Sequence, residues 1–455
     1  MKTTVIGGGL AGCEAAWQLA KRGVTVTLYE MKPYKMTPAQ TLPTMAELVC
    51  SNSLRSDRLS NAVGLLKEEM RRLDSLVLRV ADATRVPAGG ALAVDREAFS
   101  KGVEEAIRNH ENITVLREEI TRIPEGNVII ATGPLTSDAF SDAISQLEGL
   151  STLHFYDAAA PIVTAESLDH HSVFEMSRYD RGADYLNCPM DETQYMAFVQ
   201  ALKTAETVAV KGFEEKAVFE GCMPIESMAK RGDMAIAFGP LKPVGLIDPH
   251  TGKMPFAVVQ LRRDNFSGSL YNMVGFQTRL TFPEQRRVFG MIPGLANAEY
   301  ARYGVMHRNT FLASPGFLDE TFRVINRPQL YFAGQMTGVE GYVESAASGL
   351  VAGISMAYRL CGDTPPSFSG KTAIGAMGRY IAAANRNFQP MNCAFGLIDP
   401  LTYAAGQKKI RNKKERYERI SERALAEIDA LARQMEHEHE PLPMDSTTMP
   451  DGGML

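Results

Sequence analysis

The sequence predicts an α/β fold in which a parallel sheet is interrupted by an inserted α+β domain. Three observations predict it. A strand, a glycine turn, a helix and a second strand follow one another between Lys2 and Glu30. Near Leu153 this rhythm gives way to prolines, aromatics and short β-rich runs. A strand pattern returns at 329–333 and leads into a glycine-rich stretch, so we expect the chain to rejoin its first domain there.

The elements follow from hydrophobic periodicity and from capping residues. Before the insertion we expect strands at 3–6, 24–29, 113–116 and 127–131, and helices at 60–78 and 95–109, the latter with Asp95 as N-cap. Within the insertion 257–261 reads as a strand. After it we expect the strand at 329–333 and helices at 345–360, 373–384 and 407–434. The resulting parts are 1–155, 156–325, 326–435 and a polar, disordered tail at 436–455.

Composition bounds the class of protein. A chain of 455 residues, 45% hydrophobic and 22% charged, is long enough for two or three cores and for burial of a large cofactor. No run approaches the ~20 apolar residues of a membrane span, and the start lacks a signal-peptide cleavage site. We therefore expect a cytoplasmic protein without a membrane partner.

The cysteines and the net charge exclude further classes. No two of the six cysteines have the short spacing of a zinc site, so we expect reduced thiols and no metal. The absence of a Cys-x-x-Cys pair also disfavours a disulfide reductase. A net charge of -5 does not by itself indicate nucleic acid, so basic residues must be sought locally.

The glycines after the first strand form Gly-x-Gly-x-x-Gly at the start of a helix, the context in which this pattern binds a dinucleotide. Gly7 allows the tight turn, Gly9 leaves room for a pyrophosphate, and Gly12 lets helix and strand pack closely. Glu30 ends the second strand, where a carboxylate binds ribose hydroxyls and repels a 2′-phosphate. The expected nucleotide-binding residues are Gly7, Gly8, Gly9, Leu10, Ala11, Gly12 and Glu30.

The two later strands of the expected sheet indicate FAD and not NAD as the cofactor. The strand at 128–133 closes in Ala-Thr-Gly, and the strand at 330–334 runs into Ala-Gly-Gln. Both resemble the later strands of the glutathione-reductase-like FAD-binding Rossmann fold, in which the second strand delivers a loop to the flavin. That resemblance implies that Gly334 and Gln335 contact the cofactor.

Two cysteines lie in sequence surroundings that are unusual for a buried cysteine. Cys50 lies in a serine-rich stretch with Arg55 and Arg58 close enough to favour a thiolate. Cys222 lies between a glycine and a nearby proline, in a turn that can present its sulfur to a cleft. For each, burial as a small apolar side chain is the alternative.

Five segments together resemble the folate- and FAD-dependent tRNA (uracil-5-)-methyltransferase family. They are the glycine loop with the Cys-Glu-Ala-Ala that follows it, Leu-Val-Cys-Ser-Asn-Ser-Leu-Arg-Ser around Cys50, and the segments 220–226, 334–348 and 388–392. A related flavoprotein subunit that modifies wobble uridines shares the glycine loop and the Gly334 region, but is not expected to match at Cys50 and Cys222.

The resemblance implies transfer of the methylene of 5,10-methylenetetrahydrofolate to C5 of the T-loop uridine at tRNA position 54. Reduced FAD would supply the electrons, and NADH or NADPH would regenerate it. Uracil C5 becomes nucleophilic when a thiolate adds to C6. We assign that attack to Cys222 and proton removal, or handling of the intermediate, to Cys50; the reverse assignment stays open.

The remaining substrate contacts are less sharply indicated. His307 is a candidate to stack on the folate pterin or to contact the flavin, and is equally well explained as a polar loop residue. Two groups of basic residues are candidates to bind tRNA phosphates: Arg262 with Arg263, and Lys408 with Lys409 and Arg411. The group at 408–411 is also explained as the solvated face of a helix.

Three functions remain in competition: the tRNA methyltransferase, the wobble-uridine flavoprotein subunit, and a non-catalytic RNA-binding flavoprotein. The sequence leaves monomer and homodimer open, and does not choose between the two nicotinamide reductants.

Overall fold

A computed structural model describes residues 1–37, 39–150, 152–158, 160–178, 182–208, 223–385, 388–403 and 409–437. For 152–158 and 306–310 it describes the backbone alone. Its largest core lies around a five-stranded parallel sheet. The strands, in spatial order, are β16 (Leu330–Phe332), β7 (Val128–Ile130), β1 (Lys2–Ile6), β2 (Thr25–Tyr29) and β6 (Ile113–Leu116).

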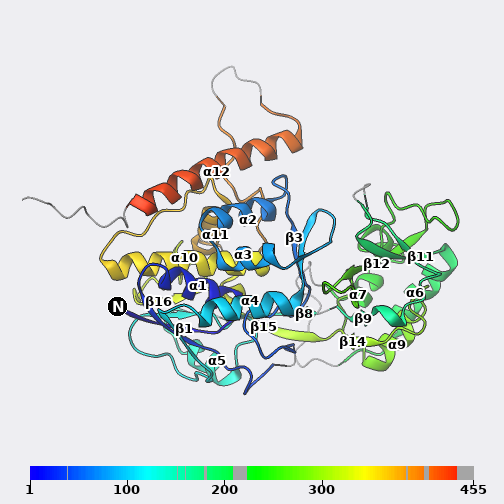
Figure 1. The fold of residues 1–455 in the computed structure, drawn as a ribbon, viewed down its shortest axis with the longest axis horizontal. Coiled ribbons are helices and arrows are strands. Elements are labelled where there is room, and N and C mark those ends of the chain that lie inside the picture. The colour runs from blue at the N-terminus through cyan, green and yellow to red at the C-terminus, as the bar shows by residue number, and fades with distance from the viewer. Residues whose placement is uncertain are drawn as a thin grey trace, which may run out of the picture.

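All five strands were predicted, and the interrupted α/β fold is confirmed. β16 follows the insertion in sequence and pairs in parallel with β7, Leu330 opposite Val128. Two small-residue helices lie side by side against the sheet, α1 (Leu10–Ala20) and α10 (Tyr342–Cys361) (Figure 1). A Cβ added at Gly349 would lie 2.1 Å from the carbonyl oxygen of Ala11, so the glycine is what permits this close approach.

The other helices of this part cover the sheet and one another. They are α2 (Ala62–Arg72), α3 (Leu76–Ala83), α4 (Arg96–Arg108), α5 (Asp138–Ser145), α11 (Ala373–Ala382) and α12 (Lys413–His437). A small antiparallel sheet of β3 (Ser53–Ser56), β5 (Ala91–Val94) and β4 (Arg85–Val86) lies beside them. Figure 1 shows α12 packed against α2, at the edge of the molecule.

The inserted part has its own core and an antiparallel sheet. Its strands are β10 (Phe174–Glu175), β11 (Tyr185–Met190), β12 (Ala257–Arg263), β13 (Leu270–Met273), β9 (Ile162–Thr164) and β14 (Tyr300–Arg302). Its helices are α6 (Glu192–Thr204), α7 (Ile225–Lys230), α8 (Ala235–Phe238) and α9 (Phe282–Phe289). The antiparallel pair β8 (Thr152–Ala158) and β15 (Met306–Leu312) links the two parts. The division of the chain into the four parts given above stays a prediction.

Two helix predictions were wrong in detail. The helix expected at 60–78 is two helices, because Asp74 takes a left-handed conformation (φ 55°) and Ser75 caps α3 by accepting a hydrogen bond from the Leu78 N–H. The helix expected from 407 begins at Lys413, where Asn412 accepts hydrogen bonds from the next turn. The cap predicted at Asp95 is confirmed, since its side chain accepts from the Ala98 N–H.

Candidate functional site

The glycine loop joins β1 to α1, and two of its glycines are required by the protein itself. Gly7 has a φ of +103°, and a Cβ there would lie 2.5 Å from the Ala131 carbonyl oxygen. A Cβ at Gly12 would lie 1.8 Å from the carbonyl oxygen of Gly7. Backbone conformation and close packing therefore account for these two positions.

Gly9 is different. Its φ of -78° and ψ of -171° suit any residue, and a Cβ there would meet no described atom within 4 Å. Gly9 is also the N-cap of α1, where it offers no side-chain acceptor to the first N–H groups of the helix. An uncapped helix N-terminus beside open space is the arrangement that receives a phosphate group. The loop thus fits a dinucleotide, because a glycine at this position leaves room for a pyrophosphate.

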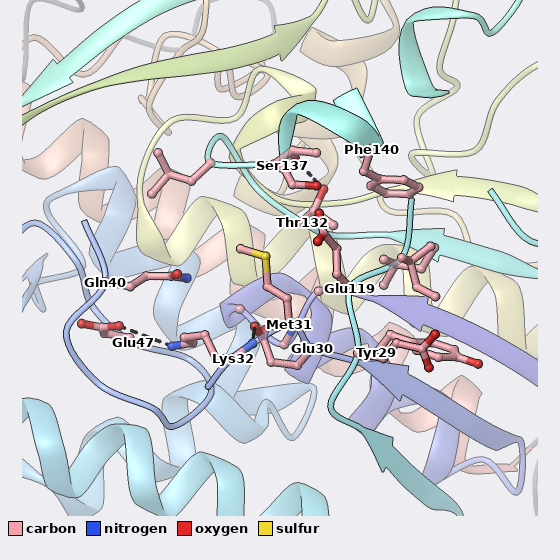
Figure 2. A pocket seen from close by; sticks show the side chains of 18 of the residues that line it. Tyr29, Glu30, Met31, Lys32, Gln40, Glu47, Glu119, Thr132, Ser137 and Phe140 are labelled. Atoms are coloured by element: carbon pink, nitrogen blue, oxygen red, sulfur yellow. Dashed lines mark hydrogen bonds and ion pairs between the residues drawn. The ribbon is translucent and has the colours of Figure 1, made fainter. Parts of the chain in front are cut away.

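Glu30 lies at the end of β2 beside this loop. Its Oε2 accepts a hydrogen bond from the Gly8 N–H at 2.7 Å, and its Oε1 accepts one from the Lys32 N–H at 2.9 Å. These bonds fix the carboxylate at the wall of a pocket that the glycine loop also lines. Figure 2 shows Glu30 facing this pocket, with Thr132 and Phe140 on another wall. The carboxylate keeps lone pairs for ribose hydroxyls.

A buried ion pair shapes the same pocket. Lys32 Nζ lies 3.3 Å from Glu47 Oε2, and both side chains are almost fully buried (Figure 2). Glu47 also accepts hydrogen bonds from the backbone N–H and the hydroxyl of Thr41. The pair holds the loop that leads from the pocket to Cys50. Nothing in the local sequence pattern distinguishes these two charges from solvated ones, so the ion pair could not be predicted.

A second cleft lies at the N-terminus of α10, and it brings together residues from distant parts of the chain. Cys50, Arg262 and Gln335, each singled out from the sequence, line it together. Its wall also includes Ser51, Ser53, Leu54, Arg55, Ala160, Asn272, Val274, Gly275, Gln277, Glu340, Gly341, Tyr342, Val343 and Asn392.

Cys50 is half-buried. Its backbone N–H and that of Ser51 donate to the Tyr342 hydroxyl oxygen, at 2.6 and 3.2 Å. Burial raises the pKa of Tyr342, and the charge of Cys50 raises it further, so this hydroxyl stays protonated. Tyr342 thereby fixes the backbone that carries the thiol against the first turn of α10.

Arg55 lines the same cleft as Cys50, and further cations near Cys50 come from distant parts of the chain. Arg55 pairs with a buried carboxylate, and Arg58 is exposed at a separate hollow. Arg96 and Arg302 both interact electrostatically with Cys50. Burial opposes the charge of Arg96, but Asp264, 2.9 Å away, raises its pKa above the ordinary value. Burial lowers the pKa of Arg302. Only the fold brings these arginines near Cys50.

Arg262 and Arg263 do not form one patch. Arg262 is buried, and its guanidinium donates to Asn52 Oδ1 at 2.9 Å and Ser51 Oγ at 2.7 Å. Burial lowers the pKa of Arg262. Arg263 is partly exposed and lies 3.8 Å from Glu175. Successive residues of a strand point to opposite faces, which separates the two side chains.

Gly334 and Gln335 begin the loop after β16. Gly334 has a φ of +88°, and its N–H donates to Ser348 Oγ at 2.7 Å, while a Cβ there would lie 3.2 Å from that of Ala11. Gln335 Nε2 donates to the carboxylate of Glu340 at 2.9 Å. The predicted contact segment therefore lies between the glycine loop and the Cys50 cleft.

The other predicted residues are only partly described. His307 lies on β15 opposite Asp157, and its side chain is outside the described part. Lys409 and Arg411 are exposed just before α12. Cys222 and Lys408 lie outside the described residues, as does nearly all of the predicted tail. Within the described ranges, no group of three His, Cys, Asp or Glu residues is placed to hold a metal, and no helix has the length and apolar character to cross a bilayer.

Comparison with known proteins gives one family. The family model described as "Glucose inhibited division protein A" matches residues 2–364. The Lactobacillus acidophilus protein named "Methylenetetrahydrofolate--tRNA-(uracil-5-)-methyltransferase TrmFO" is 60% identical over 94% of this chain and 98% of its own length. A protein of the same name from Listeria monocytogenes is 59% identical over 95% and 99%. The solved structure of Aquifex aeolicus GidA superposes with a TM-score of 0.69 at 16% identity, covering 95% of this chain and 73% of that one, which shows a shared fold.

Proposed function

The chain belongs to the methylenetetrahydrofolate--tRNA-(uracil-5-)-methyltransferase family, and on that premise we propose that it transfers the methylene of 5,10-methylenetetrahydrofolate to C5 of the T-loop uridine 54 of tRNA. One observation of the structure carries the proposal beyond the family name. Cys50, the buried Arg262 and the loop after β16 converge on a single cleft at the N-terminus of α10.

FAD is the cofactor that we propose for the first pocket and the loop after β16. The loop Gly7–Gly12 would hold its pyrophosphate, Glu30 its ribose, and Gly334 and Gln335 would lie along its path toward the Cys50 cleft. When bound and reduced by NADH or NADPH, FAD supplies the hydride that converts a methylene into a methyl group.

The protein's own residues would activate the uracil. A thiolate adds to C6, which places negative charge on the ring and makes C5 nucleophilic. C5 then forms a bond to the methylene carbon of the folate. A base removes the proton from C5, and the bond between the methylene carbon and the folate nitrogen breaks, which releases tetrahydrofolate as its amine and leaves an exocyclic methylene on the ring. A hydride adds to that methylene as the thiolate leaves C6. We propose Cys222 as the C6 nucleophile and Cys50 as the proton acceptor.

Chain connectivity supports a role for Cys222 in this cleft. The N–H of Ile225 donates to the carbonyl oxygen of Gln277 at 2.8 Å, and Gln277 lines the cleft. Cys222 itself lies outside the described residues and precedes Ile225 by three positions in the sequence.

The tRNA would be held in part by the exposed cations before α12, Lys409 and Arg411, through its phosphates. A target base in the T-loop would have to leave its stack to reach the cleft. The compartment that the activity requires is the one where tRNA matures, the cytoplasm.

Deletion of the gene tests the proposal in the cell. We expect 5-methyluridine to disappear from position 54 of the tRNA pool while wobble-uridine modifications persist, as measured by nucleoside mass spectrometry and primer extension. Intact methyluridine with lost wobble modification would overturn the proposal in favour of the wobble-uridine alternative.

A further inference from the structure

A strained bulge lies in the wall of the Cys50 cleft. β3 pairs with β5 at Ser53 opposite Ala93 and at Ser56 opposite Ala91, so the register shifts between the two pairs. Arg55 falls in this interval with a φ of 63°, a conformation rare for residues other than glycine. Bulges beside active sites re-aim a side chain, and strain of this kind persists only where neighbouring groups enforce it.

A buried lysine enforces this bulge. Lys67, on α2, is fully buried, and its Nζ donates to the carbonyl oxygens of Leu54 at 2.9 Å and Ser56 at 2.6 Å. These carbonyls flank Arg55 on both sides. The ammonium therefore satisfies backbone groups that the shifted register turns away from the sheet, and it fixes the direction in which Arg55 leaves the strand.

The Arg55 side chain ends on the cleft wall at the first turn of α10. Its Nη2 pairs with Oε1 of Glu344, and a Cβ on Gly341 would lie 2.9 Å from that Nη2. The same Cβ would lie 2.4 Å from Oε2 of Glu344, so only a glycine at this place leaves room for the pair. Gly341 lines the cleft and is the N-cap of a 20-residue helix for which no side-chain cap is described.

The two partners differ in exposure. The Glu344 side chain is fully buried and also accepts a hydrogen bond from the Cys393 N–H at 2.9 Å. The Arg55 side chain is 39% exposed. Glu344 thus orients the guanidinium from behind, and the planar group, with five N–H donors, keeps a face toward the cleft.

We propose that Arg55 is the anion-binding residue of this cleft, aimed by the bulge that Lys67 holds, and that it takes an oxyanion of a substrate. The inference rests on the proposed function, whose two large substrates both carry such groups: phosphates on the RNA and carboxylates on the folate. A guanidinium at a helix N-terminus binds either group by charge-assisted hydrogen bonds.

The decisive comparison uses two variants of the FAD-loaded protein, Glu344→Gln and Glu344→Gln combined with Arg55→Gln. Both variants lack the buried Glu344 carboxylate, so removing Arg55 leaves no buried charge without a partner. The two variants therefore differ only in the Arg55 cation. Arg58→Gln in the Glu344→Gln background is the matched control, because it removes an exposed cation outside the cleft. Binding of a T-loop stem transcript and of tetrahydrofolate is measured separately.

We expect the variant without Arg55 to lose roughly tenfold or more in affinity for one ligand and little for the other. A loss of affinity for the transcript, together with a decrease of about one in the slope of log affinity against log salt concentration, identifies a phosphate as the bound group. Loss for tetrahydrofolate identifies a carboxylate. Unchanged affinity for both ligands, or an equal loss in the Arg58 control, overturns the inference. Wild-type protein that binds neither ligand refutes the proposed function instead.

Lys67→Met tests the positioning role. We expect it to weaken the same ligand as the loss of Arg55 does, and to add little when Arg55 is already glutamine, because both changes remove one contact. Additive losses would show that Lys67 acts apart from Arg55. If Lys67→Met does not fold, the Glu344 and Arg55 variants still decide the inference.

Discussion

Alanine at Gly9 should separate flavin binding from folding. The backbone at Gly9 suits alanine, and the added Cβ meets no described atom within 4 Å. Reduced freedom of the unfolded chain should stabilise the apoprotein by about 0.4–1 kcal/mol. Alanine is a poorer N-cap than glycine by a comparable amount. The two effects nearly cancel, so we expect the apoprotein to unfold within ~1 kcal/mol of wild type.

FAD affinity should respond differently, since the new methyl group occupies the space beside the uncapped end of α1 where the pyrophosphate would lie. We expect Kd to rise at least tenfold, or ~1.4 kcal/mol. The assay is a flavin fluorescence titration of the apoprotein together with its thermal unfolding. Gly12→Ala is the contrast, because its Cβ would lie 1.8 Å from the Gly7 carbonyl oxygen and should lower the unfolding temperature as well. Wild-type flavin affinity in Gly9→Ala would refute the reasoning.

Three further predictions concern catalysis and stability. Cys222→Ala should keep its flavin absorbance and lose methylation of a T-loop transcript; activity near wild type would remove Cys222 from the mechanism. Asp264→Asn should lower the free energy of unfolding by about 3–5 kcal/mol, because it leaves Arg96 as an unpaired buried charge. Glu175→Gln removes a carboxylate from an exposed pair and should change the free energy of unfolding by no more than ~1 kcal/mol. Equal unfolding temperatures for the two variants would contradict this. Burial lowers the pKa of Lys67 from 10.5 to about 7, so the folded protein gives up a proton that the unfolded chain retains, and wild-type stability should rise from pH 7 toward pH 10 relative to Lys67→Met. If the unfolding temperatures of wild type and Lys67→Met change in parallel across that pH range, the lowered pKa of Lys67 is excluded.

The sequence predicted the parts of this molecule that depend on local pattern. The glycine loop, the strand that ends in Glu30 and the returning strand β16 each carry their own signal of periodicity and turn residues. The motif around Cys50 and four other segments together carried the family resemblance, which the curated relatives confirm.

What it could not predict are the charges that the fold brings together. Arg96 and Arg302 lie far from Cys50 in the chain, and no local pattern couples them to it. Lys67 reads as one more charge on an amphipathic helix, yet the fold buries it against the backbone of β3. Arg55 was recognised as a neighbour of the cysteine, but its ion pair with Glu344 depends on the approach of α10.

The most direct test of the proposed activity is to follow the methylene carbon from the folate into the RNA. The purified, FAD-loaded protein is incubated with unmodified tRNA, NADH or NADPH, and methylenetetrahydrofolate labelled in its methylene, and the RNA is digested to nucleosides. We predict label in 5-methyluridine from position 54, and none when that uridine is replaced by cytidine. Absence of label from the RNA, or label that persists in the cytidine transcript, would contradict the proposed function while leaving the fold and its flavin site intact.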